Sequence, residues 1–367
     1  MGRRQCAMEG LVIDSSFWKG RRVFITGHTG FKGGWLLLWL RQLGAHITGY
    51  ALEPTTTPAF FNEARVFDSL QQNIDGDIRD LKTLSSAMHA ARPEIVIHMA
   101  AQALVQESYV DPVGTYSTNV MGVVNLYEAV RGVSSVKAVL NITSDKCYEN
   151  KEWYWGYRET EPMGGCDPYS SSKGCSELIS AAYRQSFFEK EGVGIATARS
   201  GNVIGGGDWS DDRIVPDAMR AFINKKPLLV RNPFATRPWQ HVLEPLSGYI
   251  ILCQALVQHF QEFSEGWNFG PNDKGARPVS DLANIMVKGW GDDASWVLDK
   301  ESYPHEACFL KLDCSKANSR LKWQSIWSLE RSLNETVKWY KAWSNKEDMY
   351  EFSLNQIKAY QNEIIVK

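Results

Sequence analysis

The sequence predicts an α/β fold with one doubly wound parallel sheet and a smaller C-terminal α/β domain. Three observations predict it. Short apolar runs alternate with helical segments over about the first 200 residues. A glycine-rich turn, GHTGFKGG, separates the first apolar run from the first helix. Beyond about residue 200, glycine-, aspartate- and proline-containing loops interrupt the alternation.

The alternation also predicts the individual elements. Buried strands are expected at residues 21–26, 46–51, 94–99, 138–143 and 194–199, with another before residue 77. Helices are expected at 35–43, 80–92, 116–132 and 170–189. Strands joined by helices in this way form a Rossmann arrangement.

Three regions are expected along the chain. Residues 1–20 are predicted to be a short, poorly ordered leader, and residues 21–200 a dinucleotide-binding Rossmann domain. Residues 201–367 are predicted to be mainly a substrate-binding domain, with segments that return to the Rossmann domain.

Composition excludes several classes of function. The 367 residues carry 40 basic and 42 acidic side chains, which gives no support for binding to nucleic acid or anionic membranes. No stretch approaches the roughly 18 apolar residues of a membrane span, and the N-terminus lacks the apolar core of a signal peptide. Seven cysteines without a CxxC pair indicate reduced thiols and a cytoplasmic protein. The histidines show no HxH or HExxH spacing, so no metal site is expected.

The glycine-rich turn predicts dinucleotide binding. Gly27 and Gly30 let the backbone approach a pyrophosphate, and Gly33 allows the helix to pack closely on the strand. The N-terminus of the following helix receives the phosphate charge. A glycine pattern alone is weak, but here it lies between a strand and a helix, as the function requires.

The second strand favours NAD over NADP. Glu53, shortly after that strand, is the candidate to bind the ribose 2′-hydroxyl, and no Arg or Lys falls between residues 44 and 64 to bind a 2′-phosphate. Asp77 follows the third strand, where such folds hold adenine. Alternatively, Asp77 or Asp80 caps the next helix.

Tyr169 and Lys173 are four residues apart in YSSSK, which places them on one face of a helix. A nearby ammonium, together with a cationic nicotinamide ring, would lower the phenol pKa from its ordinary value near 10. Tyr169 would then serve as a base for an alcohol being oxidised.

Ser144, Asp145 and Lys146 follow the strand predicted at residues 138–143. Two interpretations compete for the adjacent acid and base. Asp145 and Lys146 form a local loop ion pair of little energetic worth, or they transfer protons. The neighbouring Ser144 and the later YxxxK pair favour proton transfer.

Longer stretches carry a resemblance to a known family. They include VFITGHTGFKGGWLLLWL, GDIRD, MAAQ, TYSTNVMG, NITSDKCYEN and RPWQHVLEPLSGY. With these and YxxxK, nearly the whole chain resembles an extended short-chain dehydrogenase/reductase, and within that group the nucleotide-sugar 4,6-dehydratases. The sequence closely resembles the branch of these dehydratases that acts on CDP-glucose. It implies a tightly held NAD, with cofactor positions at Gly27, Gly30, Phe31, Gly33, Asp77, Ile78, Ala100, Ala101, Gln102, Asn119, Tyr169 and Lys173.

The resemblance also implies a reaction in which a CDP-sugar loses water. Tyr169 would take the proton of the sugar 4-hydroxyl, Ser144 would bind that oxygen, and Lys173 would bind the nicotinamide ribose. Many relatives carry Asp-Glu where this chain has Asp145-Lys146. We expect Asp145 to protonate the departing 6-hydroxyl and Lys146 to remove or relay the C5 proton. A lysine used as a base needs a lowered pKa.

The family pattern implies where the sugar nucleotide binds. An Arg can form paired hydrogen bonds with a diphosphate. The candidates are Ser108, Asn202, Arg213, Arg237 and Tyr303.

Two alternatives remain open for the activity and one for the class of protein. A nucleotide-sugar 4-epimerase shares the cofactor site and YxxxK, and a dehydratase could act on another nucleotide-hexose. A non-catalytic dinucleotide sensor would be expected to lack the tyrosine or the lysine. The family also implies a homodimer through the helices at 116–132 and 170–189, with further assembly into tetramers left open.

Overall fold

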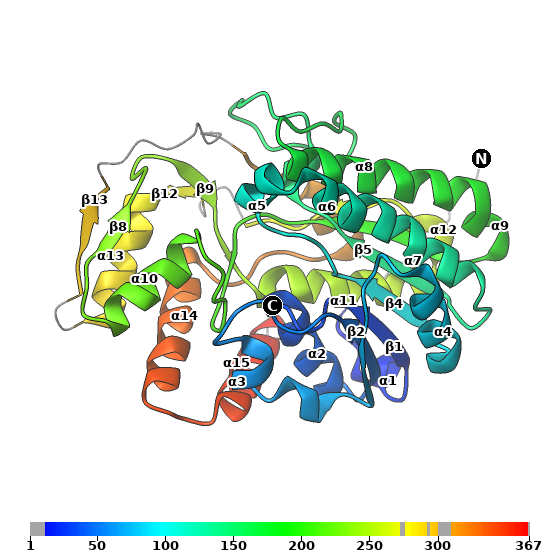
Figure 1. The fold of residues 1–367 in the computed structure, drawn as a ribbon, viewed down its shortest axis with the longest axis horizontal. Helices are drawn as coiled ribbons and strands as arrows, with labels where there is room; N and C mark the ends of the chain where they lie inside the picture. The colour runs from blue at the N-terminus through cyan, green and yellow to red at the C-terminus, as the bar shows by residue number, and fades with distance from the viewer. Residues whose placement is uncertain (1–11, 272–275, 292–293, 300–309, 366–367) are drawn as a thin grey trace.

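The computed structural model describes residues 12–271, 276–291, 294–299 and 310–365 (Figure 1). Its centre is a seven-stranded sheet with the order β3-β2-β1-β4-β5-β6-β11, in which every neighbouring pair is parallel. The strands are β1 Arg22–Thr26, β2 His46–Ala51, β3 Gln72–Asp75, β4 Ile95–His98, β5 Ala138–Ile142, β6 Gly194–Arg199 and β11 Gly266–Asn268.

The predicted Rossmann sheet is therefore confirmed, and the five bounded strand predictions agree to within a residue at each end. Strand order reverses beside β1, which neighbours both β2 and β4. The carboxyl ends of the strands at such a switch point form the usual ligand crevice of an open α/β sheet.

Helices cover both faces of the sheet (Figure 1). Alternate strand residues supply the two cores: Val23 and Ile25 join one, and Phe24 joins the other. The first core includes helices α2 Phe31–Gln42, α11 Leu243–Gln258 and α15 Met349–Ile365. The second includes α4 Leu81–Ala91, α7 Gly122–Arg131 and residues from α8 Pro168–Tyr183.

Two π-turns lengthen the helices of the second face. The turn η2 Ser117–Met121 joins α6 Pro112–Tyr116 to α7, and η4 Arg184–Phe188 joins α8 to α9 Glu189–Glu191. Shorter helices and turns occupy the connections. They are α1 Ser15–Trp18, α3 Phe60–Glu63, η1 Val66–Ser69, α5 Val105–Val110, η3 Asp145–Cys147, α12 Phe260–Phe263 and η6 Ala317–Leu321.

A smaller lobe stands beside the sheet, to the left in Figure 1. Its helices are α10 Ile214–Ile223, α13 Val279–Trp290 and α14 Leu329–Ser344. Three two-stranded sheets connect these segments: β8 Leu228–Val230 with β13 Trp296–Leu298, β9 Thr236–Pro238 with β12 Ala276–Pro278, and β7 Val203–Ile204 with β10 Gln240–His241. Although α11 and β11 follow residue 200, they pack with the central sheet.

The leader predicted over residues 1–20 is wrong in its last part. Residues Ser15–Trp18 form a helix whose cap, Asp14, accepts a hydrogen bond from the Ser16 backbone. Trp18 is completely buried in the first core. Burial of so large an apolar side chain fixes this segment against the sheet. In the described part of the chain, no helix is long and apolar enough to cross a membrane.

Candidate active site

The glycine loop lies against the end of β4. Gly27 has φ of 73°, and a Cβ built on it would lie 2.5 Å from the backbone nitrogen of Ala100. A Cβ on Gly33 would lie 2.3 Å from the carbonyl oxygen of Gly27. Only glycine fits these two positions, which leaves backbone exposed before the N-terminus of α2. This cradle suits a pyrophosphate, so the residues fit a dinucleotide.

Two predicted cofactor residues shape the loop after β4. The Asn119 side chain accepts a hydrogen bond from the Gln102 backbone and donates to the Gln102 carbonyl and to Ser172. The Gln102 side chain bonds to the Leu104 backbone and to Thr115. In this structure both side chains are occupied in holding the loop.

The structure shows which of the two aspartates, Asp77 or Asp80, caps helix α4. Asp80 caps α4 by accepting from two backbone N–H groups, whereas Asp77 forms an ion pair with Arg79. The Arg79 hydrogen bond lowers the pKa of Asp77. Ile78 is buried in the second core, and Glu53 is exposed two residues beyond β2.

The end of β5 delivers Asp145 into the interior. Ser144 caps the turn η3: its Oγ accepts from the Lys146 backbone N–H at 3.2 Å and donates to Asp145 Oδ1 at 3.0 Å. Asp145 is only 3% exposed, and a Cβ on Gly201 would lie 1.8 Å from its Oδ2. The missing side chain of Gly201 therefore makes room for the carboxyl group.

Burial raises the pKa of Asp145, although Lys146, Ser144 and Arg237 oppose the rise. Desolvation disfavours the carboxylate, so the proton is retained to higher pH than in water. Asp145 is thus suited to donate a proton. Lys146, the next residue of the turn, is only half-buried.

Tyr169 and Lys173 lie in the first turns of α8, which Asp167 caps. Both are nine-tenths buried, and Lys173 Nζ donates to the carbonyl of Ile142 at 3.3 Å. Burial lowers the pKa of Lys173 to about 8. Burial also raises the pKa of Tyr169 to about 12, against an opposing hydrogen bond from Ser144.

The Tyr169 shift is opposite to the expected one. Desolvation of the phenolate outweighs the Ser144 hydrogen bond and the positive charge of Arg213. A base at Tyr169 therefore needs a further positive charge beside it, which a bound oxidised nicotinamide would supply.

Sequence reasoning missed Lys32, in the turn of α2 next to Gly33. Its Nζ donates to Ser200 Oγ at 3.1 Å and to the Tyr249 hydroxyl at 3.3 Å. Burial lowers the pKa of Lys32 to about 7, with smaller contributions from other cations nearby and an opposing one from Asp145. The sequence could have indicated its burial, because Lys32 lies between the glycine turn and the apolar run at residues 35–40.

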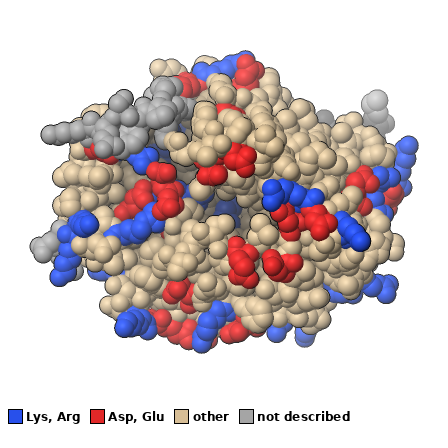
Figure 2. Space-filling model, viewed as in Figure 1, with Lys and Arg blue, Asp and Glu red and all other residues tan. Residues whose placement is uncertain are grey.

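Figure 2 shows the molecule hollowed near the centre of this face, with Lys or Arg atoms at the bottom of the hollow. Arg213 pairs with the buried Asp208 at 2.9 Å and interacts electrostatically with Tyr169. Arg237, on β9, interacts electrostatically with Asp145. Both predicted diphosphate ligands thus act on residues of the candidate site.

The other predicted sugar-nucleotide residues differ in placement. Asn202 follows Gly201 and has φ of 46°, a conformation that asparagine tolerates better than most residues. Ser108 is completely buried and donates to the Val105 carbonyl. Tyr303 lies outside the described residues. Among the described residues, no group of three potential ligands could hold a metal.

Comparisons with known proteins agree with this geometry. The model of the family described as GDP-mannose 4,6 dehydratase matches residues 24–336. The chain is 56% identical to a CDP-glucose 4,6-dehydratase of Salmonella typhimurium, over 96% of this chain and 99% of that protein. It is 23% identical to a dTDP-glucose 4,6-dehydratase of Haemophilus influenzae, over 87% of this chain and 97% of the relative.

Solved structures share the fold. A dTDP-glucose 4,6-dehydratase from Bacillus anthracis in complex with NAD superposes with a TM-score of 0.72 at 20% identity, covering 91% of this chain and all of that one. A UDP-glucose 4-epimerase from Thermotoga maritima with UDP-glucose gives 0.74 at 20% identity, covering 87% of this chain and 98% of that one. With the family match spanning most of the sequence and a relative sharing more than half of its residues, the chain belongs to the GDP-mannose 4,6 dehydratase family.

Proposed function

We propose that this chain is an NAD-dependent lyase that converts CDP-D-glucose to CDP-4-keto-6-deoxy-D-glucose and water. One observation supports it above the others. Asp145, a buried carboxyl group whose pKa is raised by burial, adjoins the set of Ser144, Tyr169 and Lys173 proposed to oxidise an alcohol. An epimerase needs only the oxidising set, whereas loss of water also needs an acid. The 56% identical relative supports cytidine as the base.

The residues first act on the sugar 4-hydroxyl. Ser144 binds this oxygen while Tyr169 takes its proton, and Lys173 holds the cofactor ribose. A bound NAD would supply the acceptor for the hydride from C4 and, once reduced, the donor of a hydride for C6. The buried position of Tyr169 excludes water from the proton transfer, which strengthens the electrostatic interactions that guide it.

Elimination then uses the turn after β5. The new 4-ketone acidifies the C5 proton, which Lys146 removes or relays. Asp145 donates its proton to the 6-hydroxyl, which departs as water. The raised pKa of Asp145 supports this role because burial favours the protonated form, from which an acid donates.

The cationic side chains beside the site are proposed to bind the CDP diphosphate. Arg213 is already oriented by Asp208, which limits the entropy lost on binding. Arg237 and Asn202 would contact the phosphates and sugar from β9 and the loop after β6. The product is proposed to serve deoxysugar biosynthesis in the cytoplasm.

We also propose a homodimer through α7 and α8. Apolar side chains remain exposed along these helices and their extensions, namely Val113 at 78%, Met121 at 51% and Leu178 at 61%. A symmetric four-helix interface would bury them. Light scattering coupled to size-exclusion chromatography checks this: Leu178→Glu should shift the protein from dimer towards monomer.

The function is tested with a panel of CDP-, dTDP-, GDP- and UDP-glucose, each product being identified by NMR. A 4-keto-6-deoxy product, formed preferentially from CDP-glucose, is expected. A galactose product would indicate an epimerase. Preference for another nucleotide would assign a different dehydratase specificity.

A further inference from the structure

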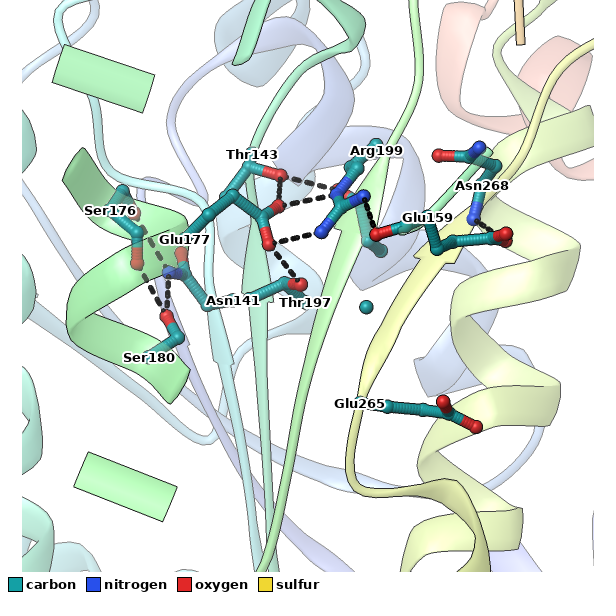
Figure 3. Close-up of polar contacts among 12 residues, drawn as sticks. Asn141, Thr143, Glu159, Ser176, Glu177, Ser180, Thr197, Arg199, Glu265 and Asn268 are labelled. Carbon is teal, nitrogen blue, oxygen red and sulfur yellow. Dashed lines mark hydrogen bonds and ion pairs between the residues drawn. The ribbon is translucent and has the colours of Figure 1, made fainter. Parts of the chain in front are cut away.

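A buried polar cluster is formed by residues that precede or follow those of the candidate site along the chain (Figure 3). Its centre is Glu177, which follows Tyr169 and Lys173 at successive four-residue steps on α8. Residues so spaced share one helix face. Figure 3 shows the Glu177 carboxylate between two threonines and Arg199.

The carboxylate receives four hydrogen bonds. Thr143 Oγ1 donates to Oε1 at 2.5 Å, and Thr197 Oγ1 donates to Oε2 at 2.7 Å. Arg199 donates from Nε at 2.9 Å and from Nη2 at 2.7 Å, an ion pair with both side chains 5% exposed. Burial opposes ionisation, but Arg199 and the hydroxyls outweigh it, so the pKa of Glu177 is lowered.

Two of these hydrogen-bond donors, Thr143 and Arg199, immediately precede along the chain the residues that surround Asp145. Thr143 directly precedes Ser144 and Asp145 at the end of β5. Arg199 ends β6 and precedes Ser200 and Gly201, against which the Asp145 carboxyl group lies. One carboxylate therefore connects the helix of Tyr169 to both strand ends that enclose Asp145.

Arg199 extends the cluster to the loop beyond the site. Its Nη1 donates to the Tyr148 hydroxyl at 2.6 Å and to the Glu159 carbonyl at 3.2 Å. Tyr148 in turn donates to Asn268 of β11 at 2.8 Å. The network is anchored on three strands and one helix, and rigid elements of this kind hold a site to within the tolerance that proton transfer needs.

We propose that Glu177 is a positioning residue for water loss, acting through Thr143 on the placement of Asp145. This rests on the proposed function, in which Asp145 protonates the leaving hydroxyl. The two threonines allow the idea to be separated from simple stabilisation. Both donate to the same buried carboxylate, but only Thr143 adjoins Ser144 and Asp145.

The test compares Thr143→Val with Thr197→Val, and uses Thr143→Ser as the conservative variant. Each valine removes one hydroxyl and keeps the side-chain shape. Urea unfolding of the cofactor-free protein should show similar losses of stability for the two valines. In single turnovers with CDP-glucose, Thr143→Val should slow dehydration by about ten- to a hundredfold relative to the oxidation step, because small misplacements at a reacting group are costly. Thr143→Ser should recover most of the rate.

Equal effects of the two valines on dehydration, or failure of serine to restore the rate, would overturn the positioning role. The wild-type protein provides the separate check on function. If it forms no 4-keto-6-deoxy product from any nucleotide-glucose, the proposed function fails. If the wild-type protein dehydrates but the two valines behave alike, only the role of Glu177 fails.

Discussion

Glu177 and Asp145 are both buried carboxyl groups beside the same strand end, yet their pKa values are shifted in opposite directions. Glu177 binds a guanidinium through two nitrogen atoms, and its pKa is lowered. Asp145 accepts a hydrogen bond from the Ser144 hydroxyl, and burial raises its pKa although the charges of Lys146 and Arg237 oppose the rise. The difference shows that a paired cation decides whether a buried carboxyl becomes a fixed anion or a proton donor.

The largest expected effect is on the proton donor. Asp145→Asn keeps the shape but removes the exchangeable acid, so dehydration should fall by about 10²- to 10⁴-fold. Oxidation at C4 should persist. Rapid-quench analysis should therefore find CDP-4-ketoglucose and reduced cofactor. Near-normal dehydration in this variant would exclude Asp145 as the acid.

The next effect is on the fixed anion. Glu177→Gln leaves the buried Arg199 without its counter-ion, and breaking such a pair costs about 3–5 kcal/mol. The free energy of unfolding, measured with urea, should fall by that amount. Asp281→Asn, which breaks an exposed pair with Arg277, is the control and should change it by less than about 1 kcal/mol. Similar losses in both variants would show that burial does not strengthen the dependence on the cation.

A third buried carboxyl group, Glu244, sharpens the comparison. It accepts from the backbone N–H groups of Ile326 and Trp327 and from Tyr360, without a bound cation in the described structure. Burial raises its pKa from 4.5 to about 7 despite these donors. Hydrogen bonds alone therefore do not keep a buried carboxyl group ionised here.

Because the folded pKa of Glu244 is raised, its contribution to stability is complete below pH 4.5 and is lost as pH rises through about 7. The wild type should lose about 3 kcal/mol relative to Glu244→Gln between these limits. Urea unfolding at a series of pH values measures the difference. Parallel profiles for the two proteins would contradict the raised pKa, since any constant cost of the amide is the same at each pH.

The smallest expected effect comes from the space beside Asp145. The Gly201→Ala methyl group would overlap the Asp145 carboxyl group, from which it would lie 1.8 Å away. Dehydration should slow about tenfold through misplacement of the acid. Gly289→Ala in α13 is the control, because its nearest contact would be an ordinary 3.4 Å. An unchanged rate in Gly201→Ala would show that Asp145 moves without loss of function.

Local patterns in the sequence predicted much of the fold and part of the site. The five strands, the glycine loop and the spacing of Tyr169 and Lys173 follow from periodicity and turn chemistry. Strand β11 was not predicted because its three residues, Gly266–Asn268, are too few to show the alternation typical of a strand. The role of Gly201 was invisible because it depends on contact between the ends of β5 and β6. The direction of the Tyr169 shift depends on burial, which residue spacing does not reveal.

The single face of α8 has a mechanical consequence. Tyr169, Lys173 and Glu177 lie on one hydrogen-bonded rod, so their mutual distances survive any small displacement of the helix. Glu177 also accepts hydrogen bonds from Thr143 and Arg199. Such a displacement therefore moves the ends of β5 and β6 together with the helix. Thermal motion would therefore move the proton acceptor of oxidation and the proton donor of dehydration together, as one body.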